Sequence, residues 1–261
     1  MDAAICTSTG LNIVASSGQS IFRVARTQYG PLNPPPRVLA KDPVEEWSRW
    51  DTPGRTVYGC STAKGAFVEV LEYIRPDPPP TPLTELFDDV GPGDADTFAE
   101  QIAGELPAHG AMPYRSIPRA WRQERSLYEL KLPYSGWFVD ITGAESISVV
   151  SEQLGPTLLA QCGIQQLTLS ELASSSEEFK KLTTGIATWI RESVHLYDGE
   201  RPHGVIYPSK WGRTFENWAM WLRRMDDETG SDPLTWVETF DIGRHTKPFV
   251  DAAQLRGMRI Y

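Results

Sequence analysis

The sequence predicts one mixed α+β domain. Its 261 residues are 40% hydrophobic and 10% aromatic, with nine tryptophans, which is enough apolar material for one large core. Segments that alternate apolar and polar residues, as half-buried strands do, are interleaved with segments of helical spacing. No internal repeat divides the chain, so we expect a single α+β domain over residues 21–261.

The chain begins with a segment of different character. Residues 1–20 are rich in Ser, Thr, Gly and Ala and show little apolar periodicity, which predicts a flexible N-terminal arm. From Ile21 the run IFRVAR alternates apolar and basic residues and ends at the turn-rich YGPLNPPP, so we expect a strand. TVYGC, residues 56–60, predicts the next strand, and AKGAFVEVLEYI has helical spacing with Glu69 inside the helix.

Residues 76–113 differ from the segments on either side. They contain PDPPPTP, the acidic run FDDVGPGDAD and an amphipathic stretch around TFAEQIAGEL, a pattern that predicts an acidic, proline-rich insertion. A lid over a pocket and a decorative insertion both fit this segment. The decorative interpretation is favoured because the segment encodes no chemistry.

The second half continues the mixed pattern. We expect strands at SLYELKLP, GWFVDIT, HGVIYPS and WVETFDI, and helices over residues 145–154, over residues 167–194 and near the C-terminus. HGVIYPS places Ser209 at a strand end, and FENWAMWLRRM predicts a helix or an aromatic packing segment. Trp211, Trp218 and Trp221 are spaced for packing, so we expect them in the core.

Charge and cysteine content narrow the classes of partner. A formal charge of −9 and a pI near 5.0 disfavour direct nucleic-acid binding and attachment to an anionic membrane. The N-terminal residues lack the pattern of a signal peptide, and no stretch approaches the roughly 18 apolar residues of a membrane helix. Three scattered cysteines and four histidines without HExxH spacing predict neither disulfides nor a metal site. We therefore expect a cytoplasmic protein without a metal.

Familiar nucleotide and hydrolase motifs are missing from the sequence. Neither GxGxxG nor GxxxxGK[ST] occurs, which disfavours a Rossmann dinucleotide-binding protein and a P-loop nucleotide-binding protein. Ser209 lies in YPSKWG without the flanking glycines of GxSxG, which disfavours an α/β-hydrolase. What remains is a set of arginines, aromatic residues and one acid near strand ends, followed far along the chain by a serine. They are Arg23, Arg49 with Trp50, Arg55, Tyr58, Glu69 and Ser209.

These residues carry a resemblance to the RES domain family, named for its characteristic Arg, Glu and Ser. The matching stretches are IFRVAR, RWDTPGRTVYGCSTAKGAFVEVLEYI, LYELKLP with GWFVDIT, and GVIYPSKWGRTFENWAMW, in family order over roughly residues 21 to 225. The three name-giving residues correspond to Arg23, Glu69 and Ser209. The family's GRWN-like stretch corresponds to residues 48–51, with Ser48 in place of the usual glycine and Asp51 in place of the common asparagine.

The resemblance implies a fold like that of ADP-ribosyltransferases, with a split β-sheet core and surrounding helices, and an activity that consumes NAD. Several family members are toxins of toxin–antitoxin systems and are inactivated by a separate antitoxin protein. Some release nicotinamide by hydrolysis or phosphorolysis of NAD, and others transfer ADP-ribose to a protein. We therefore expect an NAD-degrading toxin with NAD as substrate, an antitoxin as partner and, in the phosphorolytic case, phosphate as co-substrate.

The residue chemistry suits that reaction. Cleavage of the nicotinamide N-glycosidic bond develops positive charge on the ribose, which a carboxylate such as Glu69 can stabilise. Arg23 and Arg49 are candidates to bind the pyrophosphate, Tyr58 to lay its ring against nicotinamide, and Ser209 to donate to a phosphate or ribose oxygen. Without the resemblance, the same residues would be assigned to a solvated helix face, surface ion pairs, core packing and a turn.

Two other functions remain open. One is ADP-ribosyl transfer to a protein acceptor, for which Glu69 and Glu72, three residues apart on one helix, supply two carboxylates. The other is a binding module that senses NAD or ADP-ribose without turnover. The presence of Glu69 beside the arginines disfavours that module, because a pure binder of an anionic ligand has little use for a carboxylate.

Overall fold

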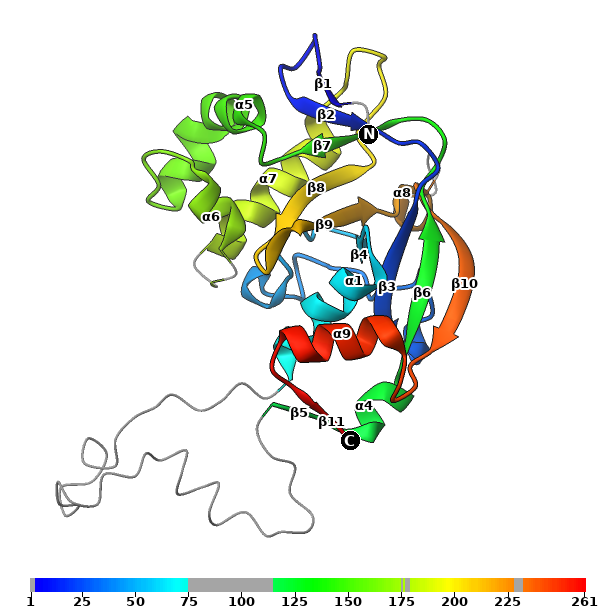
Figure 1. The fold of residues 1–261 in the computed structure, drawn as a ribbon. Coiled ribbons are helices and arrows are strands. Elements are labelled where there is room, and N and C mark those ends of the chain that lie inside the picture. Colours follow the sequence, from blue (N-terminus) through cyan, green and yellow to red (C-terminus); the bar gives the residue numbers. More distant parts are fainter. Residues whose placement is uncertain (1–2, 75–114, 175, 177–178, 228–231) are drawn as a thin grey trace, which may run out of the picture.

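A sheet of nine strands organises the residues that the computed structural model describes, which are 3–74, 115–174, 176, 179–227 and 232–261 (Figure 1). Helices pack on this sheet, and a two-stranded sheet of β11 and β5 lies apart from it. The fold is therefore mixed α+β in a single domain, as the sequence patterns predict. The insertion expected at residues 76–113 lies outside the described residues.

The strands follow in chain order. They are β1 (Ala3–Ile5), β2 (Asn12–Ala15), β3 (Ser20–Arg26), β4 (Thr56–Cys60), β5 (Ser116–Ile117), β6 (Arg125–Lys131), β7 (Trp137–Asp140), β8 (Gly204–Ser209), β9 (Gly212–Trp221), β10 (Thr235–Asp241) and β11 (Arg259–Ile260). The α-helices are α1 (Ala63–Val70), α4 (Arg119–Gln123), α5 (Ala144–Leu154), α6 (Leu169–Ala173), α7 (Lys180–Ser193), α8 (Arg223–Asp227) and α9 (Lys247–Leu255). Short turns of other helix types are η1 (Thr27–Tyr29), η2 (Val44–Glu46), η3 (Leu71–Tyr73) and η4 (Gly155–Leu159).

The large sheet has the strand order β1-β2-β7-β8-β9-β4-β3-β6-β10. Neighbouring strands are antiparallel except for β7 and β8, which are parallel. The order places β3 and β4 near the middle of the sheet. These two strands share a single registered pair, Phe22 with Cys60, so the sheet separates there on either side of that pair.

Residues 3–20 do not form the flexible arm that their composition predicts. β1 and β2 form a hairpin, and β2 pairs with β7 at one side of the sheet. Leu11 and Ile13 are fully buried in the main core. A short apolar cluster, Leu11 to Val14, is therefore sufficient to fix this segment, because the strand pairing supplies the hydrogen bonds that its composition did not reveal.

The two faces of the sheet are covered differently. On one face, strand residues from both halves pack on one another, as Ile21, Phe138 and Trp218 do, and this core cluster contains no helical residue. On the other face, α5, α6 and α7 cover the half with β7 and β8, while α1 and α9 cover the half with β3 and β4 (Figure 1). The two groups of helices thus flank the place where β3 and β4 separate.

Most of the expected elements are confirmed, and two more expectations about individual elements need correction. Of the two alternatives for FENWAMWLRRM, aromatic packing is confirmed and the helix is not: its first seven residues lie in β9, where Trp218 and Trp221 are buried, and α8 follows. β9 is buried on both faces at its C-terminal end, so apolar residues follow one another without the alternation of a half-buried strand. Such a continuous apolar run does not distinguish a strand from a helix. The helix expected over residues 167–194 is two helices, α6 and α7.

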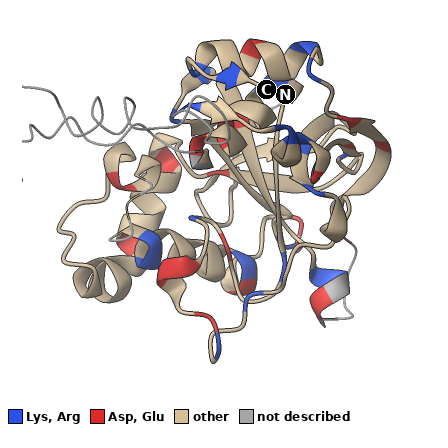
Figure 2. Ribbon diagram, turned by 90° about the horizontal axis from the view of Figure 1, so that it is seen from below, with Lys and Arg blue, Asp and Glu red and all other residues tan. Residues whose placement is uncertain are grey.

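The tryptophan expectation holds for two of the three residues. Trp218 and Trp221 are buried, whereas Trp211 is 38% exposed and its ring lies under the guanidinium of Arg256 at 3.3 Å. Basic and acidic side chains are interspersed over the described elements (Figure 2). In the described part of the chain, no helix combines the length and the hydrophobicity needed to span a membrane.

Candidate active site

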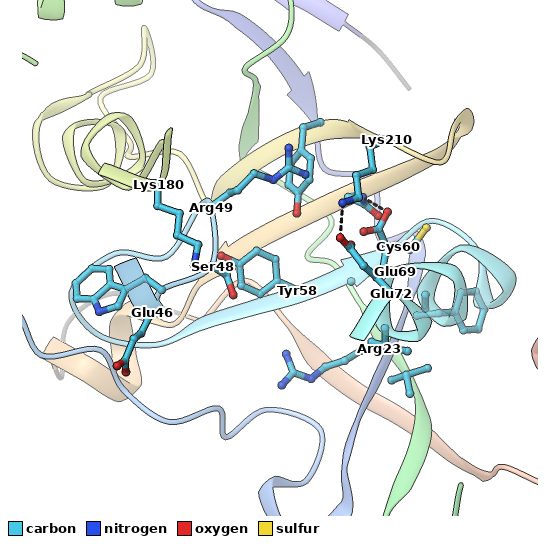
Figure 3. A pocket seen from close by; sticks show the side chains of 18 residues that line it. Arg23, Glu46, Ser48, Arg49, Tyr58, Cys60, Glu69, Glu72, Lys180 and Lys210 are labelled. Atoms are coloured by element: carbon cyan, nitrogen blue, oxygen red, sulfur yellow. Dashed lines mark hydrogen bonds and ion pairs between the residues drawn. The ribbon is translucent and has the colours of Figure 1, made fainter. Parts of the chain in front are cut away.

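A cavity of about 530 Å³ lies where β3 and β4 separate (Figure 3). Its walls come from strands of both sheet halves, from α1 and α7, and from residues 46–49. Four of the five residues expected in a site line it, which are Arg23, Arg49, Tyr58 and Glu69. The other side chains used below that line it are Glu46, Cys60, Glu72, Lys180, Tyr207, Lys210 and Asn217.

The helix α1 brings Glu69 over the sheet. The helix begins after Thr62, whose hydroxyl accepts a hydrogen bond of 3.1 Å from the amide of Gly65. A Cβ on Gly65 would lie 2.2 Å from the sulfur of Cys60, so glycine at this position permits the close approach of α1 to β4. Burial raises the pKa of the Cys60 thiol, which therefore remains protonated at the cavity wall.

Two side chains hold one oxygen of the Glu69 carboxylate. Oε1 accepts hydrogen bonds from the hydroxyl of Ser209 at 2.5 Å and from Nδ2 of Asn217 at 2.9 Å. In the described part of the chain, Oε2 accepts no hydrogen bond. The carboxylate is thus fixed through one oxygen, and its second oxygen is available to a molecule in the cavity.

Ser209 acts on Glu69 and is not one of the residues that line the cavity. Its side chain is buried, and its oxygen also accepts a hydrogen bond of 3.0 Å from the amide of Trp211. The sequence assigned Ser209 a direct contact with a phosphate or ribose. In the structure its hydroxyl donates to the Glu69 carboxylate.

Arg23 lies on β3, where that strand separates from β4. Its Nε is buried, and among the described residues the guanidinium makes no hydrogen bond and no ion pair. Burial lowers the pKa of Arg23 to about 10, against opposing contributions from Tyr128, Tyr58 and Asp51. Arg23 is therefore charged at neutral pH, is half-buried and makes no ion pair among the described residues, so its guanidinium is available to an anion in the cavity.

The ring of Tyr58 lines the cavity while its hydroxyl is engaged elsewhere. The hydroxyl donates to Oδ1 of Asp51 at 2.8 Å and accepts from the amide of Trp50 at 3.2 Å. Burial, reinforced by the Asp51 charge, raises the pKa of Tyr58 well above its ordinary value. Tyr58 therefore offers a neutral aromatic surface to a ligand.

Arg49 is partly used for structure. Its Nη1 donates to the carbonyls of Leu172 at 3.0 Å and Ala173 at 2.7 Å, at the C-terminal end of α6. The guanidinium also lies 5.1 Å from the centroid of the Tyr207 ring. No hydrogen bond in the described residues engages its other nitrogens, so part of the planar fork remains for an anion.

Several polar lining residues were not predicted from the sequence, among them Lys180, Lys210 and Asn217. Lys210 forms an ion pair with Glu72, and Lys180, the first residue of α7, donates to the carbonyl of Glu45. Single lysines at the ends of elements carry no sequence signal. Asn217 had one, because it is a polar residue inside the otherwise apolar run NWAMW of β9.

The cavity differs in charge from the protein as a whole. Its lining holds four cationic side chains, Arg23, Arg49, Lys180 and Lys210, against the three acids Glu46, Glu69 and Glu72. Because Lys210 and Glu72 neutralise each other, the excess of positive charge lies with the arginines and Lys180. An acidic chain thus carries a cavity suited to an anionic ligand.

Comparison of this chain with protein-family models, with curated proteins and with solved structures finds no match. The candidate site therefore depends on the geometry described above. Among the described residues, no group of three or more His, Cys, Asp and Glu side chains is placed to hold a metal ion.

Proposed function

We propose that this protein is a RES-like enzyme that degrades NAD by cleaving the bond between nicotinamide and ribose. One observation carries the proposal: a carboxylate fixed through one oxygen, Glu69, shares a cavity with Arg23, whose guanidinium makes no hydrogen bond and no ion pair among the described residues. Such a pair suits a substrate that is anionic at one end and develops positive charge at the other. The volume of the cavity lies in the range of small-molecule sites.

Each part of NAD has a complementary group in this cavity. Arg23 and the remaining nitrogens of Arg49 bind the pyrophosphate through charge-assisted hydrogen bonds. The ring of Tyr58 packs against nicotinamide and leaves its hydroxyl on Asp51. Glu69 then lies at the ribose, where Oε2 is the oxygen left for the substrate.

The reaction breaks the bond between C1 of the ribose and the ring nitrogen of nicotinamide. The electron pair leaves with nicotinamide, and the ribose becomes an oxocarbenium-like cation that the Glu69 carboxylate stabilises. Water then attacks C1 and releases a proton, which gives ADP-ribose and nicotinamide. With phosphate as the nucleophile, the products are ADP-ribose 1-phosphate and nicotinamide.

The same proposal extends to fold and biological role. A sheet that separates between β3 and β4, with the cavity at the separation and helices on either side, is compatible with the split sheet of an ADP-ribosyltransferase-like fold. Depletion of NAD would arrest growth, so the enzyme would act as a toxin restrained by a separate antitoxin protein.

The alternatives have weaker support. Glu72, the second carboxylate proposed for transfer to a protein, is paired with Lys210 and is not free to activate an acceptor. A binding module has no need for two donors that orient Glu69 beside a site for an anion. Hydrolysis or phosphorolysis is therefore the function that the geometry supports best.

The test measures nicotinamide release from NAD by the purified protein, with and without phosphate, and compares Glu69→Gln with Glu72→Gln. Glutamine keeps an oxygen to accept from Ser209 and Asn217, so Glu69→Gln removes the charge and preserves the hydrogen bonds. We expect a loss of about 10²- to 10⁴-fold for Glu69→Gln. Glu72→Gln is the matched control on the same side of the cavity, and its rate should remain within about threefold of the parent.

The outcomes separate the acceptors. Release that requires phosphate identifies a phosphorylase, and release in its absence identifies a glycohydrolase. Equal rates for Glu69→Gln and the parent protein, or no release by the parent protein with either acceptor, would overturn the proposed function.

A further inference from the structure

Asn217 lies on the floor of the cavity beside Glu69. It is paired with Cys60 on β4 and with Tyr207 on β8, and side chains that are directly opposite in paired strands share one face of a sheet. All three residues line the cavity. The side chain of Asn217 therefore belongs to the face of the sheet on which a ligand would lie.

The hydrogen bond to Glu69 fixes the orientation of the Asn217 amide. An ionised carboxylate only accepts, so the atom 2.9 Å from Oε1 must be the nitrogen Nδ2. The carbonyl oxygen Oδ1 is consequently the other end of the amide. It is buried and has no hydrogen-bond partner among the described residues. Asn217 as a whole is only 3% exposed.

An unpaired buried acceptor of this kind is uncommon in a folded protein. Its cost is removed if a hydrogen-bond donor of a ligand meets it. Because Nδ2 is bonded to Oε1 of Glu69, the ligand group that reaches Oδ1 must lie next to the group that binds the carboxylate. The two acceptors therefore select two neighbouring donors on one molecule.

We propose that Asn217 is a specificity-determining residue that accepts a hydrogen bond from the 3-hydroxyl of the substrate ribose, while Oε2 of Glu69 accepts from the 2-hydroxyl. This inference rests on the proposed function. The carboxylate takes the 2-hydroxyl because that group is attached next to C1, where the positive charge develops. The vicinal cis-diol of ribose then presents its second donor to Oδ1. The substrate class is a nucleotide whose reacting ribose carries both hydroxyls free.

The test measures each protein variant with two substrates. It compares kcat/KM for nicotinamide release from NAD with kcat/KM for an analogue that lacks the 3-hydroxyl on the nicotinamide ribose. We expect the parent protein to prefer NAD by about 10- to 100-fold, since loss of the hydroxyl leaves Oδ1 unpaired again. In Asn217→Ala that preference should fall below about threefold, because the acceptor is gone from both complexes.

Ser209→Ala is the matched control. Both substitutions remove one hydrogen bond from Oε1 of Glu69, but Ser209 does not line the cavity. Ser209→Ala should therefore lower both rates and leave the preference for the 3-hydroxyl intact. Asn217→Ser is measured in parallel, and its shorter side chain supplies the same comparison if the alanine variant does not fold.

The possible failures are distinguishable. A preference that persists in the folded Asn217 variants overturns the role of Asn217 and leaves the NAD-degrading function in place, as does a parent protein that accepts both substrates equally. A parent protein that releases no nicotinamide from NAD overturns the proposed function and this inference with it.

Discussion

The hydroxyl of Tyr58 donates a hydrogen bond of 2.8 Å to Oδ1 of Asp51, and this contact joins the central strand β4 to the loop before it. Asp51 is 4% exposed, and its other oxygen accepts from Nε of Arg37 at 2.8 Å and from the amide of Ser48 at 2.9 Å. Its carboxylate anchors Tyr58 so that the ring, and not the hydroxyl, faces the cavity.

This anchoring predicts that the hydroxyl of Tyr58 contributes to stability and that its ring contributes to catalysis. Tyr58→Phe keeps the ring and removes a hydrogen bond to a buried carboxylate, so we expect a loss of about 1–3 kcal/mol in the free energy of unfolding with kcat/KM within about fivefold of the parent. Tyr58→Leu removes the ring as well, and kcat/KM should fall by at least about tenfold. Urea denaturation and nicotinamide release measure the two quantities.

Tyr58→Phe also serves as the critical control. The pKa of Tyr58 is raised by burial, so the hydroxyl remains protonated and is unsuited to act as a base. A stable Tyr58→Phe variant without activity would show that the hydroxyl takes part in the reaction and would contradict the role assigned to the ring.

The sequence predicted most individual elements because each has a local signal. The alternation in IFRVAR and the spacing of Phe67, Val70 and Leu71 indicate β3 and α1 directly. The strands β1 and β2 were missed because β2 is held by pairing with β7, more than 120 residues further along the chain, and β1 by pairing with β2, and not by their own composition.

The site was predictable in part for the same reason. Arg23, Arg49, Tyr58 and Glu69 stand out through the resemblance, and they meet in one cavity. The hydrogen bonds of Glu69 span 140 residues to Ser209 and 148 residues to Asn217, and no pattern in the chain encodes contacts over such separations.

Arg23 is predicted to lower stability in the absence of a ligand. Burial lowers the folded pKa of Arg23 to about 10, below its ordinary value, so charging it disfavours the folded state. This cost is fully present below about pH 10 and is lost as pH rises through the folded pKa towards the ordinary value. We expect Arg23→Met to raise the free energy of unfolding by about 1–2 kcal/mol at pH 7 and to weaken NAD binding at least about tenfold.

Arg26→Met is the control for Arg23→Met, because Arg26 is exposed on the same strand. It should change stability by less than about 0.5 kcal/mol and leave binding unchanged. Urea denaturation and calorimetric titration with NAD give both values. Destabilisation by Arg23→Met would mean that Arg23 makes a stabilising interaction in the protein without ligand, and would contradict its assignment as an anion-binding residue.

His203 is expected to make stability depend on pH. Its ring is 5.6 Å from that of Phe138, and Nε2 is 3.2 Å from the carbonyl of Ser135. Burial is the main cause that lowers the pKa of His203, with a smaller contribution from the charge of Arg223. The unfolded chain therefore binds the proton more readily, and stability is lost as pH falls from about 6.5 through the lowered folded pKa.

The measurement is urea denaturation at several pH values between 5 and 7.5. His203→Gln should show a shallower loss of stability on acidification than the parent, because one titrating group is removed. His245→Gln, at an exposed position, should follow the parent curve. Identical pH dependence in His203→Gln and the parent would contradict the assignment.

Asp226 is predicted to stabilise the fold without affecting the chemistry. Its carboxylate is 2.8 Å from Nη1 of Arg55 and 3.5 Å from Nη2 of Arg191, and both of its oxygens are used, since Oδ2 also accepts from the amide of Arg55. The side chains of Asp226 and Arg191 are only 6% and 4% exposed, so salt screens their ion pair weakly. Asp226→Asn removes the charge that Arg55 pairs with and one of the two acids beside Arg191, which keeps its ion pair with Glu192, and we expect it to lower the free energy of unfolding by about 3 kcal/mol.

None of these three residues lines the cavity, so nicotinamide release per folded molecule should be unchanged in Asp226→Asn below its unfolding transition. Asp241→Asn, at an exposed position on β10, is the control and should change the free energy of unfolding by less than about 0.5 kcal/mol. A loss of activity in Asp226→Asn at a temperature where circular dichroism reports a fully folded protein would show that the Arg55 segment, which leads into β4, also sets the position of Tyr58. Such a result would join the stability of this buried ion network to the geometry of the site, and equal activity would separate them.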